Sequence, residues 1–178
     1  MFIIRLAYAS DKPVLDALIR KSGIGLSAGF YTNQQAEAIT REVFGVDSAL
    51  VADGTYFAIE AGDVIVACGG WSKRATDFGG DHAKSGDDRL LDPATEPARI
   101  RAFFVDPDFA RQGLGAMLLE HCTRTAARAG FKALELVSTM PGEPLYLRYG
   151  FTPLERITLS LSDGVKVDLT RMRKEIAS

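Results

Sequence analysis

The chain has 178 residues, 47% of them hydrophobic and 25% charged, which fits one well-buried domain of an ordinary globular protein. The formal net charge of −2 gives no bulk attraction to nucleic acids or anionic membranes, and the sequence has no block of Lys and Arg that would bind them. The apolar run at residues 1–6 is too short for a signal peptide or a membrane span, so we expect a cytoplasmic protein.

The two cysteines, Cys68 and Cys122, stand in separate apolar runs. Two cysteines are too few for a disulfide framework, and their spacing does not match a metal site. We therefore expect both to be small buried hydrophobic residues, and we expect no metal site.

The first elements are expected to be a strand, two helices and a hairpin. A short apolar run predicts a strand over residues 3–7. The capping pair Ser10-Asp11 then begins a helix that Gly25 ends, and a second helix runs from about Thr32 to Gly45.

A β-hairpin and a long loop are expected next. Residues 55–61 and 64–72 are mostly apolar runs that indicate two strands, and the short turn Gly62-Asp63 joins them. Residues 73–97 carry no periodicity. Loops of this length inside a compact domain are usually functional or mobile.

The rest of the chain is expected to alternate strands and helices before a final hairpin: strand 98–105, helix 113–129, strand 133–137, helix 142–149, and strands 152–161 and 164–173. The order β-α-α-β-β-β-α-β-α-β-β predicts an α/β fold. Its mixed sheet has about seven strands, antiparallel edges and one parallel β-α-β unit at the centre. We expect a single domain over residues 1–178, with halves of about 1–74 and 98–178 on either side of the loop.

The segment after the strand at 98–105 has the features of a phosphate-binding loop. Residues 111–116, Arg-Gln-Gly-Leu-Gly-Ala, run directly into a helix. Its two glycines let the backbone approach a ligand, and the free amides and dipole of the helix N-terminus suit a diphosphate. Tight packing of the strand against the helix is an alternative reason for the glycines. Alone, the loop predicts only a phosphate-bearing ligand.

Two nucleotide-binding motifs do not fit this loop. It is not a P-loop, because no Gly-Lys-Ser/Thr follows it. A dinucleotide-binding fingerprint would have glycine in place of Leu118 and an acidic residue at the end of the next strand, which instead ends in Val-Ser-Thr at 137–139.

Two segments together resemble the GNAT superfamily of N-acetyltransferases. Residues 101–119 resemble its acyl-CoA-binding motif, in which a strand ending in hydrophobic-Val-x-Pro leads into Gln/Arg-x-x-Gly-x-Gly/Ala. Residues 144–151 resemble its Leu-Tyr-x-x-x-Gly-Phe signature, and the order of elements matches along essentially the whole chain. One departure is Ala110, which stands where the family most often has Gln or Arg. A side-chain contact to the cofactor is therefore missing, whereas the backbone cradle is kept.

The resemblance implies a GNAT-like single-domain fold with a splayed central pair of parallel strands and an acetyl-CoA site in the gap. The positions that match the cofactor contacts are Phe103, Phe104 and Val105 for the pantetheine arm, and Arg111, Gln112, Gly113, Leu114, Gly115 and Ala116 for the diphosphate. Tyr146 matches the family tyrosine that protonates or stabilises the leaving thiolate, and packing is its alternative role.

The implied activity is transfer of an acetyl group to a primary amine of a small molecule or peptide, by direct attack on the thioester. The alternative is a catalytically silent module that binds or senses acyl-CoA. The resemblance also implies a homodimer, through the C-terminal hairpin or the edge strands.

The base that takes the amine proton is not identified by the sequence. Many relatives place a Glu on the strand corresponding to 99–105, where this chain has Arg99 and Arg101 instead. The candidates, each also explicable as a solvated surface residue, are His82, Glu96, Glu135 and Glu143, and a water chain is another route. The acceptor pocket is expected to form from residues 25–31, the second helix and the long loop.

Overall fold

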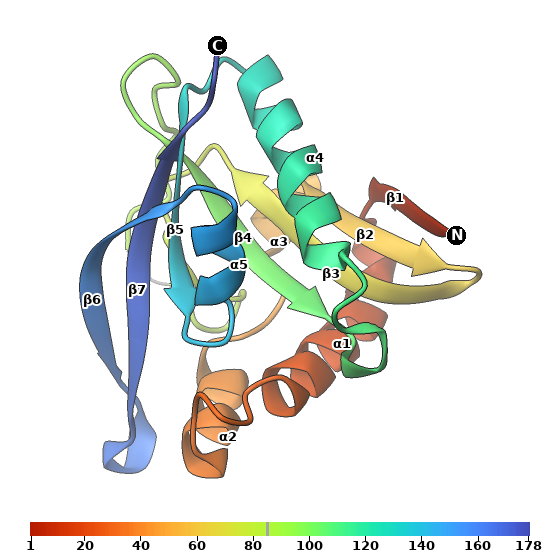
Figure 1. Ribbon diagram of the computed structural model, residues 1–178, viewed down its shortest axis with the longest axis vertical. Coiled ribbons are helices and arrows are strands. Elements are labelled where there is room, and N and C mark those ends of the chain that lie inside the picture. Colours follow the sequence, from red (N-terminus) through yellow and green to blue (C-terminus); the bar gives the residue numbers. More distant parts are fainter. Residues whose placement is uncertain (85) are drawn as a thin grey trace.

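Seven strands form one sheet, in the order β1-β2-β3-β4-β5-β7-β6 (Figure 1). The computed structural model describes residues 1–84 and 86–178, so residue 85, within the predicted long loop, lies outside the described residues. The strands are β1 (Phe2–Leu6), β2 (Tyr56–Ala61), β3 (Val64–Ser72), β4 (Ala98–Val105), β5 (Ala133–Thr139), β6 (Thr152–Ser160) and β7 (Lys166–Glu175). The α-helices are α1 (Lys12–Gly25), α2 (Asn33–Glu42), α3 (Ser48–Ala52), α4 (Leu114–Arg128) and α5 (Glu143–Arg148).

The predicted fold class and order of elements are confirmed. The β4–β5 pair is parallel and the other neighbouring strands are antiparallel, as expected of a mixed sheet. The structure adds α3, whose 5 residues are too few to show a helical period in the sequence. It also ends α2 at Glu42, earlier than the expected Gly45.

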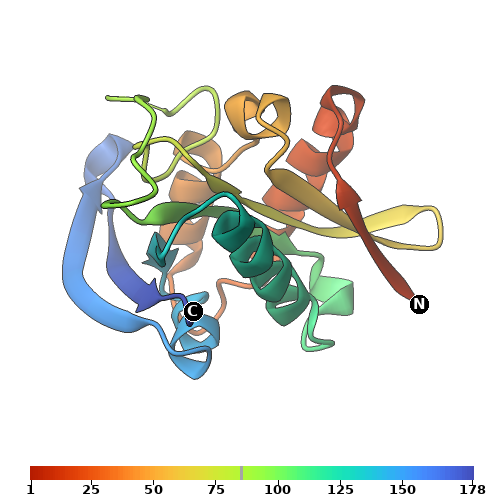
Figure 2. The same ribbon diagram turned by 90° about the horizontal axis from the view of Figure 1, so that it is seen from above.

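The sheet is the middle layer, with α1, α2 and α3 on one face and α4 and α5 on the other (Figure 2). Both cysteines lie in these cores and are fully buried, as expected. Burial raises the pKa of the Cys68 thiol to about 12, so this thiol is not a nucleophile at neutral pH. No helix in the described part of the chain is long and apolar enough to cross a membrane.

The strand β6 forms one edge of the sheet, and its residues from Thr152 to Arg156 are exposed. An exposed edge strand can pair with a second chain. The expected homodimer through the C-terminal hairpin of β6 and β7, or through the edge strands, stays a prediction.

The central strands β4 and β5 separate after a short contact. They pair at Ala98 with Leu134 and at Arg99 with Glu135, and then diverge toward their carboxyl ends (Figure 1). A gap in the middle of the sheet follows, because each of these two strands keeps its other neighbour.

A β-bulge in β4 lies beside this gap. The register with β3 shifts between Cys68 and Gly70, and Ala102 has a φ of 55°, in the left-handed region that alanine rarely adopts. The buried Tyr56 donates a hydrogen bond from its hydroxyl to the Ala102 carbonyl (2.9 Å). A Cβ at Gly69 would overlap the Phe103 ring. The bulge is therefore held by residues of β2 and β3.

Candidate active site

A cavity of about 860 Å³ passes through the gap between β4 and β5. Its lining includes Leu145 and Tyr146, which pack with the α4 side of the sheet, and Tyr31 and Val43, which pack on the opposite face. Because residues on both faces of the sheet line it, the cavity has one end on each face and passes through the gap between them. A ligand can therefore enter from the α4–α5 side and present its tip on the α1–α2 side.

The α4–α5 end of the cavity contains the predicted phosphate-binding loop. Arg111 and Gly113 have φ values of 65° and 83°, and Gly113 caps α4. The first hydrogen bond of the helix is donated by Met117 to the Gly113 carbonyl (3.0 Å). Within the described residues, the amides of 111–116 donate no hydrogen bond. Such a turn before a helix N-terminus is a concave anion-binding arrangement.

The predicted loop residues are brought together at this end, with one exception. The cavity is lined by Arg111, Gly113, Leu114, Gly115 and Ala116, and also by Ala110. Gln112 is exposed and lies outside that lining. Lys21 of α1 binds Asp106 and Asp108 (2.7 Å each), which ties the start of this turn to the helix.

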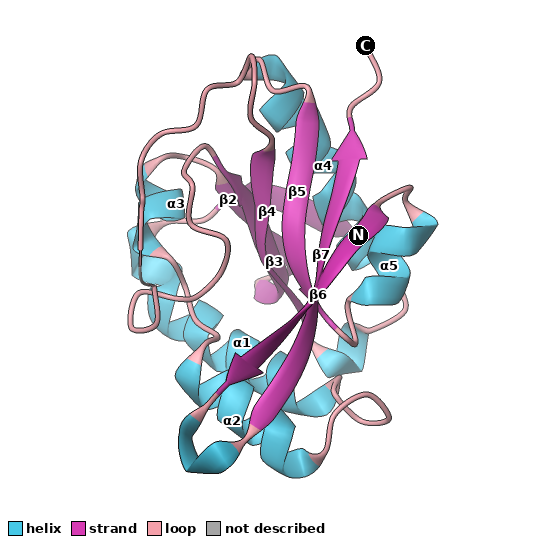
Figure 3. Cartoon of the chain, turned by 90° about the vertical axis from the view of Figure 1, so that its left-hand side faces the viewer, coloured by secondary structure: helices cyan, strands magenta, loops and turns pink. Residues whose placement is uncertain are grey.

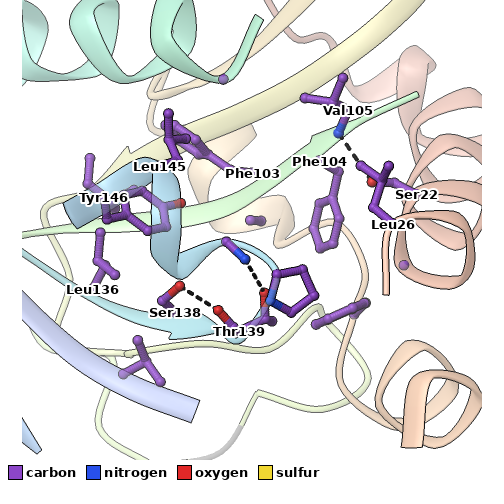
Figure 4. Close-up of a pocket in the computed structure, with 18 of the residues that line it drawn as sticks. Ser22, Leu26, Phe103, Phe104, Val105, Leu136, Ser138, Thr139, Leu145 and Tyr146 are labelled. Atoms are coloured by element: carbon purple, nitrogen blue, oxygen red, sulfur yellow. Dashed lines mark hydrogen bonds between the residues drawn. The ribbon is translucent and has the colours of Figure 1, made fainter. Parts of the chain in front are cut away.

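The end of β4 supplies the three predicted positions along the gap, and all three line the cavity. The Asp106 amide donates to Val66 of β3 (2.8 Å), so the Val105 amide faces the other way and donates to the Ser22 hydroxyl (3.2 Å; Figure 4). The centroids of the Phe103 and Tyr146 rings lie 6.2 Å apart, on the α4–α5 side. The centroids of the Phe104 and Phe44 rings lie 4.9 Å apart, on the α1–α2 side.

Tyr146, the predicted proton donor, lies in α5 against the gap and is 7% exposed. Its ring packs against Phe103 and Phe151, and Figure 4 shows it beside Leu136 with its hydroxyl directed toward the interior of the cavity. In the part of the chain that the structure describes, this hydroxyl makes no hydrogen bond. Burial raises the pKa of Tyr146 well above its usual value. The phenol is therefore protonated at neutral pH and free to donate.

The four candidate bases stand apart from the cavity, none lining it in the described chain. Glu96 is held by Arg89, whose guanidinium lowers the pKa of this carboxyl to about 2. Glu135 pairs with Arg171 (3.0 Å), and Glu143 accepts a hydrogen bond from Thr170 (3.1 Å). His82 lies against Gly45, beside a separate hollow between α1 and α2.

Asp77 is the carboxylate that lines the cavity among the described residues. Its two oxygens lie 3.1 Å from Arg99 Nε and 3.0 Å from Arg171 Nη2. Both oxygens are thus engaged by guanidinium groups. Over the same residues, no cluster of three or more His, Cys, Asp or Glu could hold a metal ion.

A buried ion pair, which the sequence pattern does not reveal, shapes the long loop. Arg101 of β4 and Asp47 are 3% and 1% exposed, and their side chains lie 3.1 Å apart. Arg101 also donates to the carbonyls of Thr76 (3.3 Å) and Gly79 (2.8 Å). Arg101 therefore holds the loop against the cavity.

Tyr31 closes the α1–α2 end of the cavity. Its hydroxyl donates to the Asp168 carbonyl of β7 (2.7 Å) and accepts from the Met140 amide (2.9 Å). Burial raises the pKa of Tyr31 to about 12, so both hydrogen bonds persist at neutral pH.

Replacing Tyr31 with phenylalanine should lower the free energy of unfolding by about 1–3 kcal/mol, because a buried amide and a carbonyl lose their partner. Urea denaturation measures this loss. The same change at Tyr8, which is 58% exposed, is the control and should stay within about 0.5 kcal/mol. Equal midpoints for the two variants would show that the Tyr31 hydroxyl does not hold this end closed.

Comparison with known proteins agrees with this geometry. Residues 26–151 match the family model of the acetyltransferase (GNAT) family. No curated protein sequence matches the chain.

Solved structures share the fold over nearly the whole chain. A GCN5-related N-acetyltransferase from Rhodopseudomonas palustris is 20% identical, with a TM-score of 0.71 over 97% of this chain and 94% of that one. PaiA N-acetyltransferase from Thermoplasma acidophilum, solved with coenzyme A, is 13% identical, with a TM-score of 0.65 over 98% and 99%. The yncA protein from Salmonella typhimurium, solved with its cofactor acetyl-CoA, is 16% identical, with a TM-score of 0.65 over 99% and 95%.

Proposed function

The chain belongs to the acetyltransferase (GNAT) family of acyltransferases, and we propose that it transfers the acetyl group of acetyl-CoA to a primary amine by direct attack on the thioester. The observation that carries this proposal is the cavity that passes through the gap between β4 and β5. It begins at the amides of 111–116 and ends on the opposite face of the sheet. A long thioester with a diphosphate at its far end matches both features.

The residues around the gap fit such a ligand. The amides of 111–116, with Arg111 beside them, would hold the diphosphate. Backbone of Phe103, Phe104 and Val105 would lie along the pantetheine arm, and the Val105 amide can exchange its Ser22 partner for the ligand. When bound, acetyl-CoA supplies the activated acetyl group. Because these contacts use backbone, they do not depend on the side chain that Ala110 lacks.

In the proposed reaction, the nitrogen of a neutral amine forms a bond to the thioester carbonyl carbon. The carbon–sulfur bond breaks with its electron pair on sulfur. Tyr146 donates its phenolic proton to that sulfur, and the proton lost by nitrogen restores the phenol through water. Asp77 lines the cavity, but its carboxylate is paired with Arg99 and Arg171 and is therefore a poor proton acceptor. Water is for this reason the proposed carrier of the proton.

Two measurements test the proposal. Acetyl-CoA at a hundred times its dissociation constant should stabilise the protein by about 2.7 kcal/mol, which raises the unfolding midpoint by about 5–10 °C, whereas ATP and NAD should not. Release of free thiol from acetyl-CoA should then increase when a primary amine is added. Stabilisation without amine-stimulated release would favour a silent acyl-CoA-binding module, and stabilisation by NAD or ATP alone would overturn the proposal.

A further inference from the structure

The α1–α2 end of the cavity is walled by aromatic rings from separate segments of the chain. They are Phe30 and Tyr31 after α1, Phe44 after α2, Phe78 in the long loop, and Phe104 of β4. Phe44 and Phe104 meet edge to face, at an interplanar angle of 65°. Phe30 is 50% exposed at the rim. Walls of this kind favour a flat apolar group, since paired aromatic rings attract each other by about 0.5–1.5 kcal/mol beyond the area they bury.

The charged side chains at this end already have partners. Asp77 is engaged by Arg99 and Arg171, and Arg101 is engaged by Asp47 and two carbonyls. Arg111 and Arg148 line the other end, on the phosphate loop and α5. A carboxylate or a second ammonium on the acceptor would therefore lose its hydrating water without finding an unpaired charge of opposite sign. Binding of such an acceptor would be unfavourable.

Contacts between α2 and the β6–β7 hairpin close the same end from the side. Gln35 donates to the Lys166 carbonyl (2.8 Å), and the Ser162 amide donates to Glu42 (3.0 Å). Side chains of α2 and β7 form one apolar cluster between them, and Figure 3 shows the tip of the hairpin beside α2. An extended peptide could therefore not leave the cavity between α2 and this hairpin.

From these three features we infer that the acceptor is a small primary monoamine whose substituent is aromatic, not a polyamine, an amino acid or a peptide N-terminus. The inference rests on the proposed acetyl transfer and specifies its second substrate. The ring would lie among the phenylalanines, with the amine directed to the gap between β4 and β5.

Thiol release at saturating acetyl-CoA, with four acceptors, tests the inference. The first acceptor is 2-phenylethylamine, and the second is phenylalanine, which carries a carboxylate in addition. The third is spermidine, which has further cations and no ring, and the fourth is a short peptide that begins with phenylalanine. The kcat/KM for 2-phenylethylamine should exceed the other three by at least about 100-fold, the effect of burying one unpaired charge. A preference for another acceptor, or equal rates, would overturn the inference and leave acetyl transfer intact. Release with none of them would overturn both.

A variant at the rim tests where the ring lies. Phe30→Ala should raise the KM for 2-phenylethylamine about tenfold, while kcat and acetyl-CoA affinity stay within about twofold. For methylamine, which has no ring, KM should not change. Tyr8→Ala is the matched control, because Tyr8 is similarly exposed and lies outside the cavity. An unchanged KM for 2-phenylethylamine in Phe30→Ala would overturn the placement of the ring among these residues.

Discussion

Gly113→Asp should abolish acetyl-CoA binding, with an affinity loss of at least about 100-fold. The new carboxylate would stand at the N-terminus of α4, where the diphosphate is proposed to lie, and juxtaposed like charges cost several kcal/mol. The fold has room for the side chain, because a Cβ at Gly113 meets no atom within 4 Å. Only the backbone is strained, since Gly113 has a φ of 83°. Titration calorimetry with acetyl-CoA measures the affinity.

Two variants separate charge from strain in this experiment. Gly113→Ala adds at least as much strain without the charge, because aspartate adopts positive φ more readily than alanine, so it should lose only about tenfold in affinity. Gly62→Asp places an aspartate at another positive-φ glycine with open space, in the β2–β3 turn far from the cavity lining, and should bind normally. An unchanged affinity in folded Gly113→Asp would show that the diphosphate binds elsewhere.

The sheet and the loop were predictable because their signals are local. Strand-like apolar runs and short turns predict the hairpins, and the glycines at 113 and 115 predict the turn into α4. Each of these signals is contained within one or two elements of the chain.

The gap and its walls depend on contacts between distant segments, so the sequence alone did not predict them in detail. Ala102 gives no hint of a left-handed conformation, which results from Tyr56 and Gly69 on other strands. Arg101 and Asp47 are 54 residues apart, and nothing local to either indicates their pairing. The resemblance predicts that the strands splay, but not which side chains hold them.

The long loop shows the same limit. Its lack of periodicity predicts irregular structure, yet its two limbs pair at Arg74 and Leu90. The Leu91 amide donates to the Lys73 carbonyl (2.8 Å), and Arg101 holds the segment near Gly79. A loop fixed in this way places Asp77 and Phe78 on the cavity wall. The sequence indicates that the loop borders the acceptor pocket, but not which of its residues do.

Tyr146→Phe should lower kcat by about 10²–10³-fold while the affinity for acetyl-CoA stays within about threefold. The change removes the phenolic proton, whose transfer by a positioned acid is worth about this much. It keeps the ring that packs against Phe103 and Phe151, so the fold and the cavity should persist. Steady-state kinetics and calorimetry give the two quantities separately.

The leaving group provides a second test of Tyr146. A thiolate that is a weaker base departs without a proton, so a CoA analogue with a more acidic thiol should narrow the difference between the two enzymes. Tyr149, one helical turn further on, also lines the cavity and is the competing donor. If Tyr149→Phe causes the loss of kcat instead, the donor is misassigned. If Tyr146→Phe weakens acetyl-CoA binding as much as it lowers kcat, this ring only packs. A loss confined to kcat, and reduced by the more acidic thiol, would identify Tyr146 as the group that protonates or hydrogen-bonds the leaving sulfur.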